Sequence, residues 1–362
     1  MATFLLCAGG TGGHLFPAEA LAHELIARGH TIHLATDARA QRYAGSFPAE
    51  KVHTIASATF GSKNPIAMAK AAWTLFGGLR ASRRLLTELR PAAVIGFGGY
   101  PTLPPMLAAS GAFPTMLHEA NGVMGRANKA LASRVDAIAG GFLAIEGPHA
   151  RKMTRTGNPV RPAVLAAADT PYPGRREGDP FDFLAFGGSQ GASYFAEAIP
   201  AAIGSMPHEL RSLIRVVQQA RPEEESAVRA RYAELGVDAE VAPFFADLPA
   251  RIGGSHLVLS RSGASTVSEL ATIGRPSILV PYPHALDHDQ AANAASLEAE
   301  GGATLVPQSD LTPDRLGAML AAAMREPDRL ARMAGNARAT SHADAAQRLA
   351  DLAEAVAAKK GQ

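Results

Sequence analysis

The sequence has little cysteine, almost no net charge and no long apolar run. Its 362 residues include one cysteine, Cys7, which cannot form an internal disulfide, so we expect a protein of a reducing compartment. The formal net charge of +2 argues against nucleic acid binding as the main activity. No apolar run reaches the roughly 20 residues of a membrane-spanning helix. The first residues lead directly into a short apolar run, so we expect no signal peptide.

The composition is that of a globular protein, with 47% hydrophobic and 19% charged residues. Strand and helix patterns alternate, which is typical of parallel sheets with crossover helices. We expect strands at Thr3–Cys7, Thr31–Thr36, Ala93–Phe97, Thr115–His118, Ala137–Ala139, Phe181–Phe186, Leu213–Val217, Leu257–Ser260 and Ser277–Val280. The fold class is therefore α/β.

Proline and glycine concentrate in the middle of the chain, which is typical of a linker. The pattern predicts a first Rossmann-like domain at 1–160, a linker at 161–180 and a second domain at 181–340. The remaining residues, 341–362, contain an amphipathic helix that we expect to pack back on the first domain.

Both halves open with a strand followed by a glycine-rich turn and a helix. Gly9–Gly13 and Gly187–Gly191 can offer backbone N–H groups and the positive end of a helix dipole to an anion. Two such turns predict two Rossmann-like domains that face each other across a cleft. The first turn lacks G-x-G-x-x-G spacing, because Leu15 stands at the last position. Asp37, at the end of the second strand, nevertheless lies roughly 20 residues on from the glycine turn, as a ribose acceptor for NAD would, so a dinucleotide site stays open.

His14 directly follows the first glycine turn. The positive end of a helix disfavours imidazolium, which suits a neutral general base. The alternative is a histidine that only caps the turn. Gly98-Gly99-Tyr100 and His118-Glu119 follow two further strands and should lie on the same edge of the sheet.

The second half has a comparable set of polar groups. Ser189 can bind a diphosphate together with its glycine turn, and Glu269 can accept both hydroxyls of a ribose or simply favour the dipole of its helix. Asp287-His288-Asp289 has a spacing that allows a metal ion, but acids at a helix start are ordinary caps. We expect no metal and no cofactor.

Several motifs together resemble the MurG family of GT-B glycosyltransferases, glycosyltransferase family 28. They are Gly9–Pro17, Gly98–Tyr100, His118–Asn121, Gly157–Arg161, Gly187–Ala192 and Arg261–Glu269, in the order of the family. The resemblance implies an inverting, metal-independent transfer of N-acetylglucosamine from UDP-GlcNAc to the C4 hydroxyl of the muramoyl-pentapeptide on undecaprenyl diphosphate (lipid I), which gives lipid II. Ala120 and the order of residues 287–290 depart from the family pattern.

The resemblance also implies roles for individual residues. His14 is the candidate base, with His118 and Glu119 in reserve. Ser189 would meet the phosphates, Glu269 the ribose, the backbone at Phe245 the uracil, and Gln290 the sugar. Further contacts to UDP-GlcNAc would come from Thr11, Gly12, Gly13, Asn121, Arg161, Ala264, Ser265, Thr266, Val267 and Ser268.

A lipid acceptor implies a membrane-facing surface, and the segment 62–90 is amphipathic and basic. It suits an anionic bilayer, and its alternative is an ordinary helix with a solvated basic face. We expect a peripheral protein on the cytoplasmic face of the inner membrane, with other cell-wall synthesis and division proteins as partners. Three rivals remain: a UDP-GlcNAc 2-epimerase, a noncatalytic nucleotide-binding scaffold, and an NAD oxidoreductase.

Overall fold

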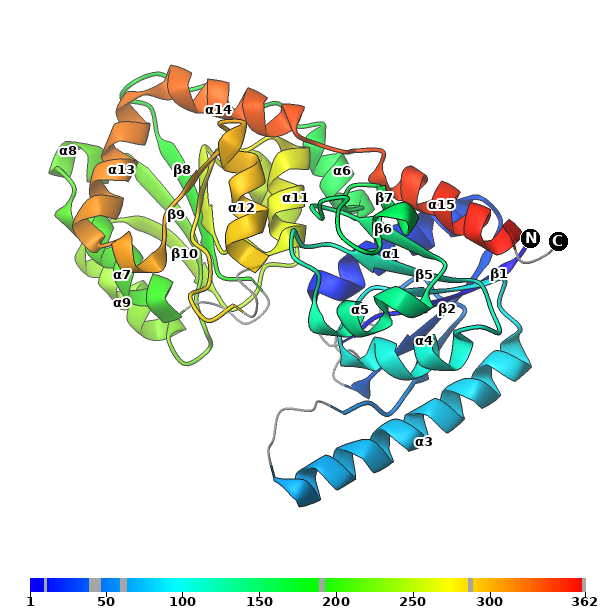
Figure 1. Cartoon of the computed structure of the whole chain (residues 1–362). Coiled ribbons are helices and arrows are strands. Elements are labelled where there is room, and N and C mark those ends of the chain that lie inside the picture. The colour runs from blue at the N-terminus through cyan, green and yellow to red at the C-terminus, as the bar shows by residue number, and fades with distance from the viewer. Residues whose placement is uncertain (10–11, 39–46, 59–63, 189–192, 286–288, 360–362) are drawn as a thin grey trace. The chain divides into compact units, whose positions relative to one another are not determined.

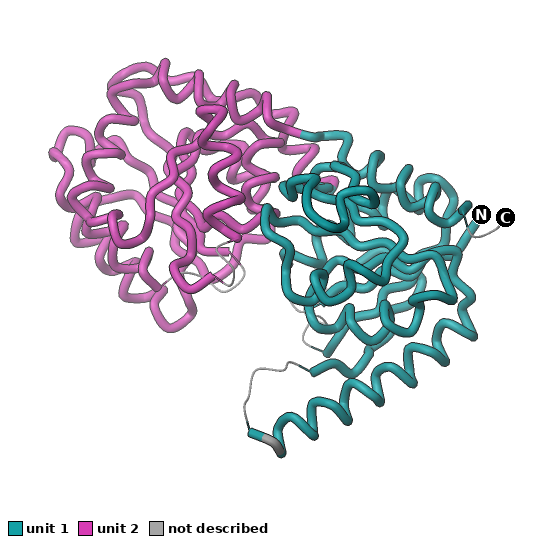
Figure 2. Tube along the Cα trace, viewed as in Figure 1, with its two compact units in different colours: residues 1–161, 342–362 teal, residues 162–341 magenta. Residues whose placement is uncertain are grey.

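The computed structural model describes residues 1–9, 12–38, 47–58, 64–188, 193–285 and 289–359. The chain forms two compact units (Figure 2). Unit 1 comprises Met1–Arg161 and His342–Gln362, and unit 2 comprises Pro162–Ser341. Thr11 and Ser189, two of the predicted site residues, lie outside the described ranges, as do Asp287 and His288.

Unit 1 contains a parallel sheet in the order β3-β2-β1-β4-β5-β6-β7 (Figure 1). Its strands are β1 (Thr3–Cys7), β2 (Thr31–Thr36), β3 (Lys51–Thr54), β4 (Ala93–Gly96), β5 (Thr115–Glu119), β6 (Ala137–Gly140) and β7 (Met153–Arg155). In the register of the sheet, Cys7 lies opposite Ala35 and Gly96. The turns after β1 and β4 are therefore neighbours at the carboxyl edge.

Helices cover both faces of this sheet. They are α1 (Gly12–Ala27), α3 (Pro65–Leu89), η2 (Tyr100–Thr102), α4 (Leu103–Ala109), α5 (Arg126–Leu131), η3 (Ala132–Arg134), η4 (Ala150–Lys152) and α15 (Ala345–Lys359). Because side chains alternate along a strand, Phe4 and Leu6 pack with α1 and α15, while Leu5 and Cys7 pack on the other face with α3 and α4. Burial on both faces explains why the central strands are continuous apolar runs.

The C-terminal helix α15 packs on unit 1, against α1. The Arg28 guanidinium, near the end of α1, lies 2.6 Å from Asp351 Oδ1 and 2.7 Å from Glu354 Oε2. His30 Nε2 lies 2.8 Å from the other oxygen of Glu354. These contacts add to the apolar packing of Leu349, which is fully buried.

Unit 2 contains a second parallel sheet, in the order β10-β9-β8-β11-β12-β13. Its strands are β8 (Phe181–Phe186), β9 (Ile214–Gln219), β10 (Asp238–Ala242), β11 (Leu257–Ser260), β12 (Ser277–Leu279) and β13 (Ala303–Leu305). Phe186, the last residue of β8, lies opposite Ser260, the last of β11, so the turns that follow these strands are neighbours.

Ten helices accompany this sheet within the described ranges. They are α6 (Pro162–Ala168), α7 (Ser193–Ser205), α8 (His208–Arg211), α9 (Glu225–Glu234), α10 (Leu248–Gly254), α11 (Ala264–Ile273), α12 (Asp289–Ala299), η6 (Gln308–Asp310), α13 (Pro313–Arg325) and α14 (Pro327–Ala339). Side chains from α7, α9 and α13 form one core with Phe181 and Phe183 of β8.

The segment for which the sequence predicts a linker contains helix α6, which packs on α10 and α11. After α6, the buried Arg275 guanidinium donates to the carbonyl oxygens of Thr170 and Pro171, and also to that of Gly253. Burial lowers the pKa of Arg275 to about 10. These hydrogen bonds hold the backbone at Thr170 and Pro171 against the rest of unit 2.

Candidate active site

His14 lies in the first turn of α1, directly after the glycine turn that follows β1. Its Nδ1 atom lies 3.0 Å from the carbonyl oxygen of Gly9. Because a carbonyl oxygen only accepts hydrogen bonds, Nδ1 carries a proton, and the lone pair of the neutral ring is on Nε2. A general base that acts through Nε2 requires this tautomer.

The glycine pair Gly98-Gly99 lies beside His14. Gly98 has a φ of 93°, in the region that favours glycine. A Cβ atom at Gly98 would lie 3.1 Å from Cδ2 of His14, and one at Gly9 would lie 2.5 Å from Cδ of Pro101. Close packing between the turns after β1 and β4 therefore requires these glycines, and the structure brings two of the predicted motifs together.

His118 and Glu119, the predicted reserve catalytic groups, end β5 and are both buried. Burial lowers the pKa of His118 to about 4, since little water remains to stabilise the imidazolium. The backbone at Gly157 opposes this effect, and His14 adds to it. His118 is therefore a neutral ring near pH 7.

The Glu119 carboxylate accepts four hydrogen bonds, three from the loop that follows β5 and one from helix α5. Oε1 accepts from the backbone N–H and the side-chain Nδ2 of Asn121, both at 3.1 Å. Oε2 accepts from the Gly125 N–H and from Nδ2 of Asn128, both at 2.9 Å. Since donors occupy both oxygens, this geometry favours a role for Glu119 in holding the loop and Asn121 in place.

Asn128 is a residue that the sequence analysis missed. It is buried, and its Nδ2 also donates to the His118 carbonyl oxygen at 3.1 Å. No motif marks this position in the sequence. Its burial follows from the packing of α5 against the end of β5.

Arg161 lies against the start of α1. Its guanidinium carbon lies 3.7 Å from the centre of the Phe16 ring, a cation–π contact. Gly12 is buried and Gly13 is exposed in the first turn of the same helix. Within unit 1, the structure thus places Gly12, Gly13, His14 and Arg161 around one helix end.

In unit 2, the second glycine turn follows β8 and precedes α7. The N–H of Gly187 donates to Oε1 of Gln219 at 3.1 Å, so this amide is already engaged. Gly188 has a φ of 83°, in the region that favours glycine, and a Cβ atom there would meet no described atom within 4 Å. An anion bound at this turn would therefore need backbone N–H groups other than that of Gly187.

Helix α11 carries the largest group of predicted nucleotide contacts. Ala264, Val267, Ser268 and Glu269 are buried, whereas Ser265 and Thr266 are partly exposed. The Ser268 hydroxyl donates to the Ala264 carbonyl oxygen at 2.9 Å. The helix begins at the carboxyl end of β11, beside the turn after β8, where ligands of parallel sheets bind.

Phe245 and Gln290 belong to two other segments of unit 2. Phe245 is buried, with the Arg251 guanidinium 4.4 Å from the centre of its ring. Gln290 lies in the first turn of α12, and its Oε1 accepts from the N–H of Tyr282 at 2.9 Å. The Gln290 N–H donates to Asp289 Oδ1 at 2.9 Å, the contact of an acid at a helix start.

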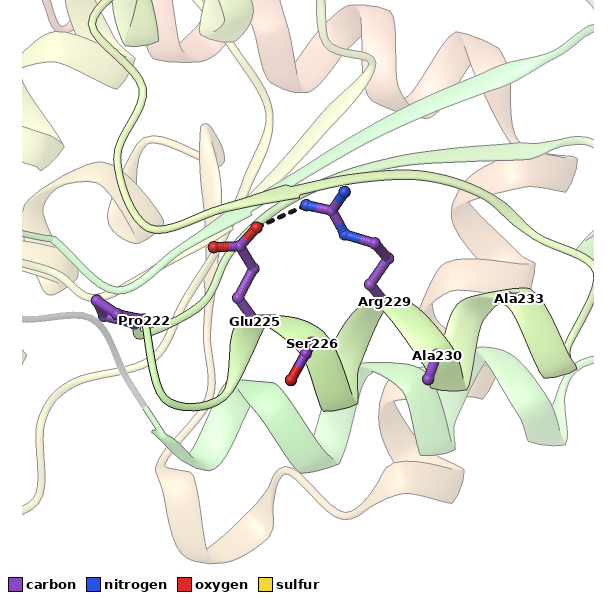
Figure 3. A pocket seen from close by; sticks show the side chains of 6 residues that line it. All are labelled: Pro222, Glu225, Ser226, Arg229, Ala230 and Ala233. Carbon is purple, nitrogen blue, oxygen red and sulfur yellow. Dashed lines mark hydrogen bonds and ion pairs between the residues drawn. The ribbon is translucent and has the colours of Figure 1, made fainter.

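A hollow beside α9 is lined by none of the predicted site residues. Its lining residues are Pro222, Glu225, Ser226, Arg229, Ala230 and Ala233 (Figure 3). Glu225 and Arg229 form an ion pair at 2.6 Å. Since the two charges pair with each other and no predicted site residue lines the hollow, we assign it no catalytic role.

Two properties of the described residues bear on cofactors and membranes. No three His, Cys, Asp or Glu side chains are grouped there so that they could hold a metal ion. None of the helices in the same ranges has the length and apolar character to cross a bilayer.

The chain is similar to known glycosyltransferases over nearly its whole length. Models of the glycosyltransferase family 28 N-terminal and C-terminal domains match residues 4–140 and 183–349. The UDP-N-acetylglucosamine--N-acetylmuramyl-(pentapeptide) pyrophosphoryl-undecaprenol N-acetylglucosamine transferase of Agrobacterium fabrum is 60% identical over 98% of this chain and 94% of its own. The enzyme of the same name from a Chelativorans species is 60% identical over 98% and 95%.

Among solved structures, the crystal structure of Acinetobacter baumannii MurG matches with a TM-score of 0.76 and 26% identity. The match covers 98% of this chain and 99% of that one. The two parallel-sheet units therefore have the GT-B fold, as the sequence predicted. The chain belongs to glycosyltransferase family 28.

Proposed function

We propose that the chain is an inverting N-acetylglucosaminyltransferase of peptidoglycan synthesis. It moves GlcNAc from UDP-GlcNAc to the C4 hydroxyl of the muramoyl-pentapeptide on undecaprenyl diphosphate. The observation that carries this proposal is the 60% identity, over nearly the full length, to enzymes named for that transfer. The identity spans both glycine turns and both sheet units.

The proposal assigns the donor nucleotide to unit 2. When the sugar leaves UDP, negative charge develops on the diphosphate, and main-chain N–H groups after Gly187 and the dipole of α7 can stabilise it. Ser189 would add its hydroxyl. Glu269 would accept the ribose hydroxyls, and the backbone at Phe245 would bind the uracil.

The proposal assigns the general base to unit 1. The acceptor C4 oxygen attacks C1 of GlcNAc, the bond from C1 to the diphosphate oxygen breaks, and the C4 hydroxyl proton passes to Nε2 of His14. The contact of Nδ1 with Gly9 supports this assignment, because it leaves the lone pair on Nε2. Single displacement inverts the configuration at C1.

The test is a transfer assay with radiolabelled UDP-GlcNAc, a short-chain lipid I analogue and EDTA. We expect label in the lipid product and an equal amount of released UDP. Release of UDP without the acceptor would favour the epimerase, and binding without turnover would favour a scaffold. An NAD oxidoreductase would instead bind a dinucleotide tightly.

We also propose that α3 contacts an anionic membrane surface. Ile66, Trp73 and Phe76 are exposed in its first half, with the Trp73 and Phe76 ring centres 6.3 Å apart. Arg80 and Arg83 are exposed further along. At 100° per residue these five side chains share the outward side of the helix, while its opposite side packs on α4 (Figure 1).

Vesicle sedimentation tests this surface. Each basic residue near an anionic surface contributes about 1 kcal/mol, and the pairing of Arg84 with Glu88 at 2.7 Å reduces its share. We expect Arg80→Gln/Arg83→Gln/Arg84→Gln to weaken binding to anionic vesicles by roughly tenfold or more. The matched control, Arg325→Gln/Arg329→Gln/Arg332→Gln, removes the same charge from α13 and α14. An equal loss of vesicle binding in both variants would mean that only the net charge of the chain matters, and would contradict a specific role for α3.

A further inference from the structure

Arg261 is a buried arginine that the proposed chemistry leaves without a role. It follows β11 directly and is 8% exposed. In the described part of the chain, no acidic side chain pairs with it. Its guanidinium instead lies 4.8 Å from the centre of the Phe195 ring and contacts neutral oxygens. A buried charge without a counter-ion is costly, so the arrangement calls for an explanation.

The guanidinium connects β11 with the segment that follows β12. Nη1 donates to the carbonyl oxygens of Val280 and Pro281, each at 3.2 Å, and Nη2 donates to Oε1 of Gln308. The planar fork of an arginine can make these contacts in fixed directions at the same time, which a lysine cannot. Arg261 therefore holds the Pro281–Tyr282 peptide from its carbonyl side.

The other side of the same peptide holds Gln290. The Tyr282 N–H donates to Gln290 Oε1 at 2.9 Å. A peptide is planar, so a guanidinium that fixes its C=O also fixes the direction of its N–H. This N–H holds the Oε1 end of the carboxamide at the peptide, so the Nε2 end is directed away from it. Nε2 is a donor suited to sugar hydroxyl oxygens.

We propose that Arg261 is a positioning residue for donor-sugar recognition: through the Pro281–Tyr282 peptide it fixes which end of the Gln290 carboxamide meets the sugar. The inference rests on the proposed function, which places GlcNAc at Gln290. Arg261 therefore contributes to binding of the GlcNAc part of the donor and not to binding of its UDP part.

The experiment compares the Kd of UDP with that of UDP-GlcNAc by calorimetry, using the full-length chain. Arg261→Lys keeps the charge and loses the fork. We expect it to weaken UDP-GlcNAc binding by about tenfold, the value of one sugar hydrogen bond, and to change UDP binding less than about twofold. Gln290→Ala should do the same. The Arg261→Lys/Gln290→Ala variant should bind UDP-GlcNAc no more weakly than Gln290→Ala alone, because both substitutions remove the same contact to the sugar.

Two results would overturn the inference. One is a loss of UDP affinity in Arg261→Lys as large as its loss of UDP-GlcNAc affinity, which would mean that the guanidinium of Arg261 serves the diphosphate or the fold. The other is additive losses in the double variant. Arg229→Lys, on the exposed face of α9, is the matched control and should change neither Kd.

A failure of the proposed function would be seen in the wild-type chain itself, which would then bind no UDP-GlcNAc or transfer no sugar. It can therefore be told apart from a failure of the inference about Arg261. Thermal unfolding checks each variant. If Arg261→Lys does not fold, Gln308→Ala loosens the same guanidinium from a partly exposed position. It should then show the same selective loss, and an unchanged Kd for UDP-GlcNAc would count against the inference.

Discussion

At the scale of single residues, the orientation of His14 is the feature most directly tied to chemistry. We predict that His14→Ala lowers kcat by about 100-fold or more, the usual contribution of a general base. The Kd of UDP should stay unchanged, because the nucleotide is assigned to unit 2. A fall in kcat of only a few-fold, with donor binding intact, would mean that another group takes the proton.

The buried His118 predicts a pH dependence of stability. The pKa of a histidine in an unfolded chain is about 6.5, and in the folded chain that of His118 is about 4. Between these values the unfolded state binds the proton and the folded state does not. The free energy of unfolding should therefore fall by about 3 kcal/mol as the pH falls from 6.5 to 4, with no such contribution above 6.5.

Urea unfolding at pH 7, 5.5 and 4.5 measures this effect. His118→Gln removes the titrating group and should flatten the curve in that window. If the variant shows the same slope as the wild type, other groups cause the acid sensitivity.

Residue types at strand ends were predictable from the sequence, but their surroundings were not. Spacing alone placed His118 and Glu119 at the carboxyl edge of a strand. It could not show that His118 is buried or that four donors occupy the Glu119 carboxylate, because these depend on how the loop after β5 and helix α5 pack over them. Arg261 begins the motif Arg261–Glu269, yet the role proposed for it depends on Pro281 and Gln290, which lie outside that motif.

At the scale of elements, burial decided which strands the sequence could predict. Every predicted strand lies in the interior of its sheet, while the described edge strands β3, β7, β10 and β13 were not predicted. Interior strands are buried on both faces and form apolar runs. The edge strand Lys51-Val52-His53-Thr54 is largely exposed, and β7 and β13 have only three residues each. Such segments lack a periodic apolar pattern.

The docking of α15 depends partly on Arg28, which joins Glu24 to two acids of that helix. We predict that Arg28→Ala lowers the free energy of unfolding by about 1–2 kcal/mol, since the pairs are partly exposed but share one guanidinium. Limited proteolysis should cut within 345–359 faster. Arg84→Ala, which breaks a pair within one helix, is the control. Equal proteolysis of both variants would show that apolar contacts alone hold α15.

At the scale of the whole molecule, the residues alone predicted two Rossmann-like parallel-sheet domains, and the resemblance carried by the motifs implied the GT-B fold. Each unit is a parallel sheet with a glycine turn after one of its central strands, and that architecture follows from the alternation of apolar strands and helices. The place where one unit ends was harder to predict. Prolines and glycines mark the segment 161–180 as irregular, but α6 packs into unit 2 through contacts that composition does not encode.

The central claim is that unit 2 holds the donor nucleotide, with its diphosphate on main-chain amides. A crystal structure of the chain with UDP tests this claim most directly. We predict the diphosphate at the turn between Gly188 and α7, with the ribose hydroxyls at Glu269. UDP bound elsewhere, or a diphosphate that contacts only a cation, would contradict it.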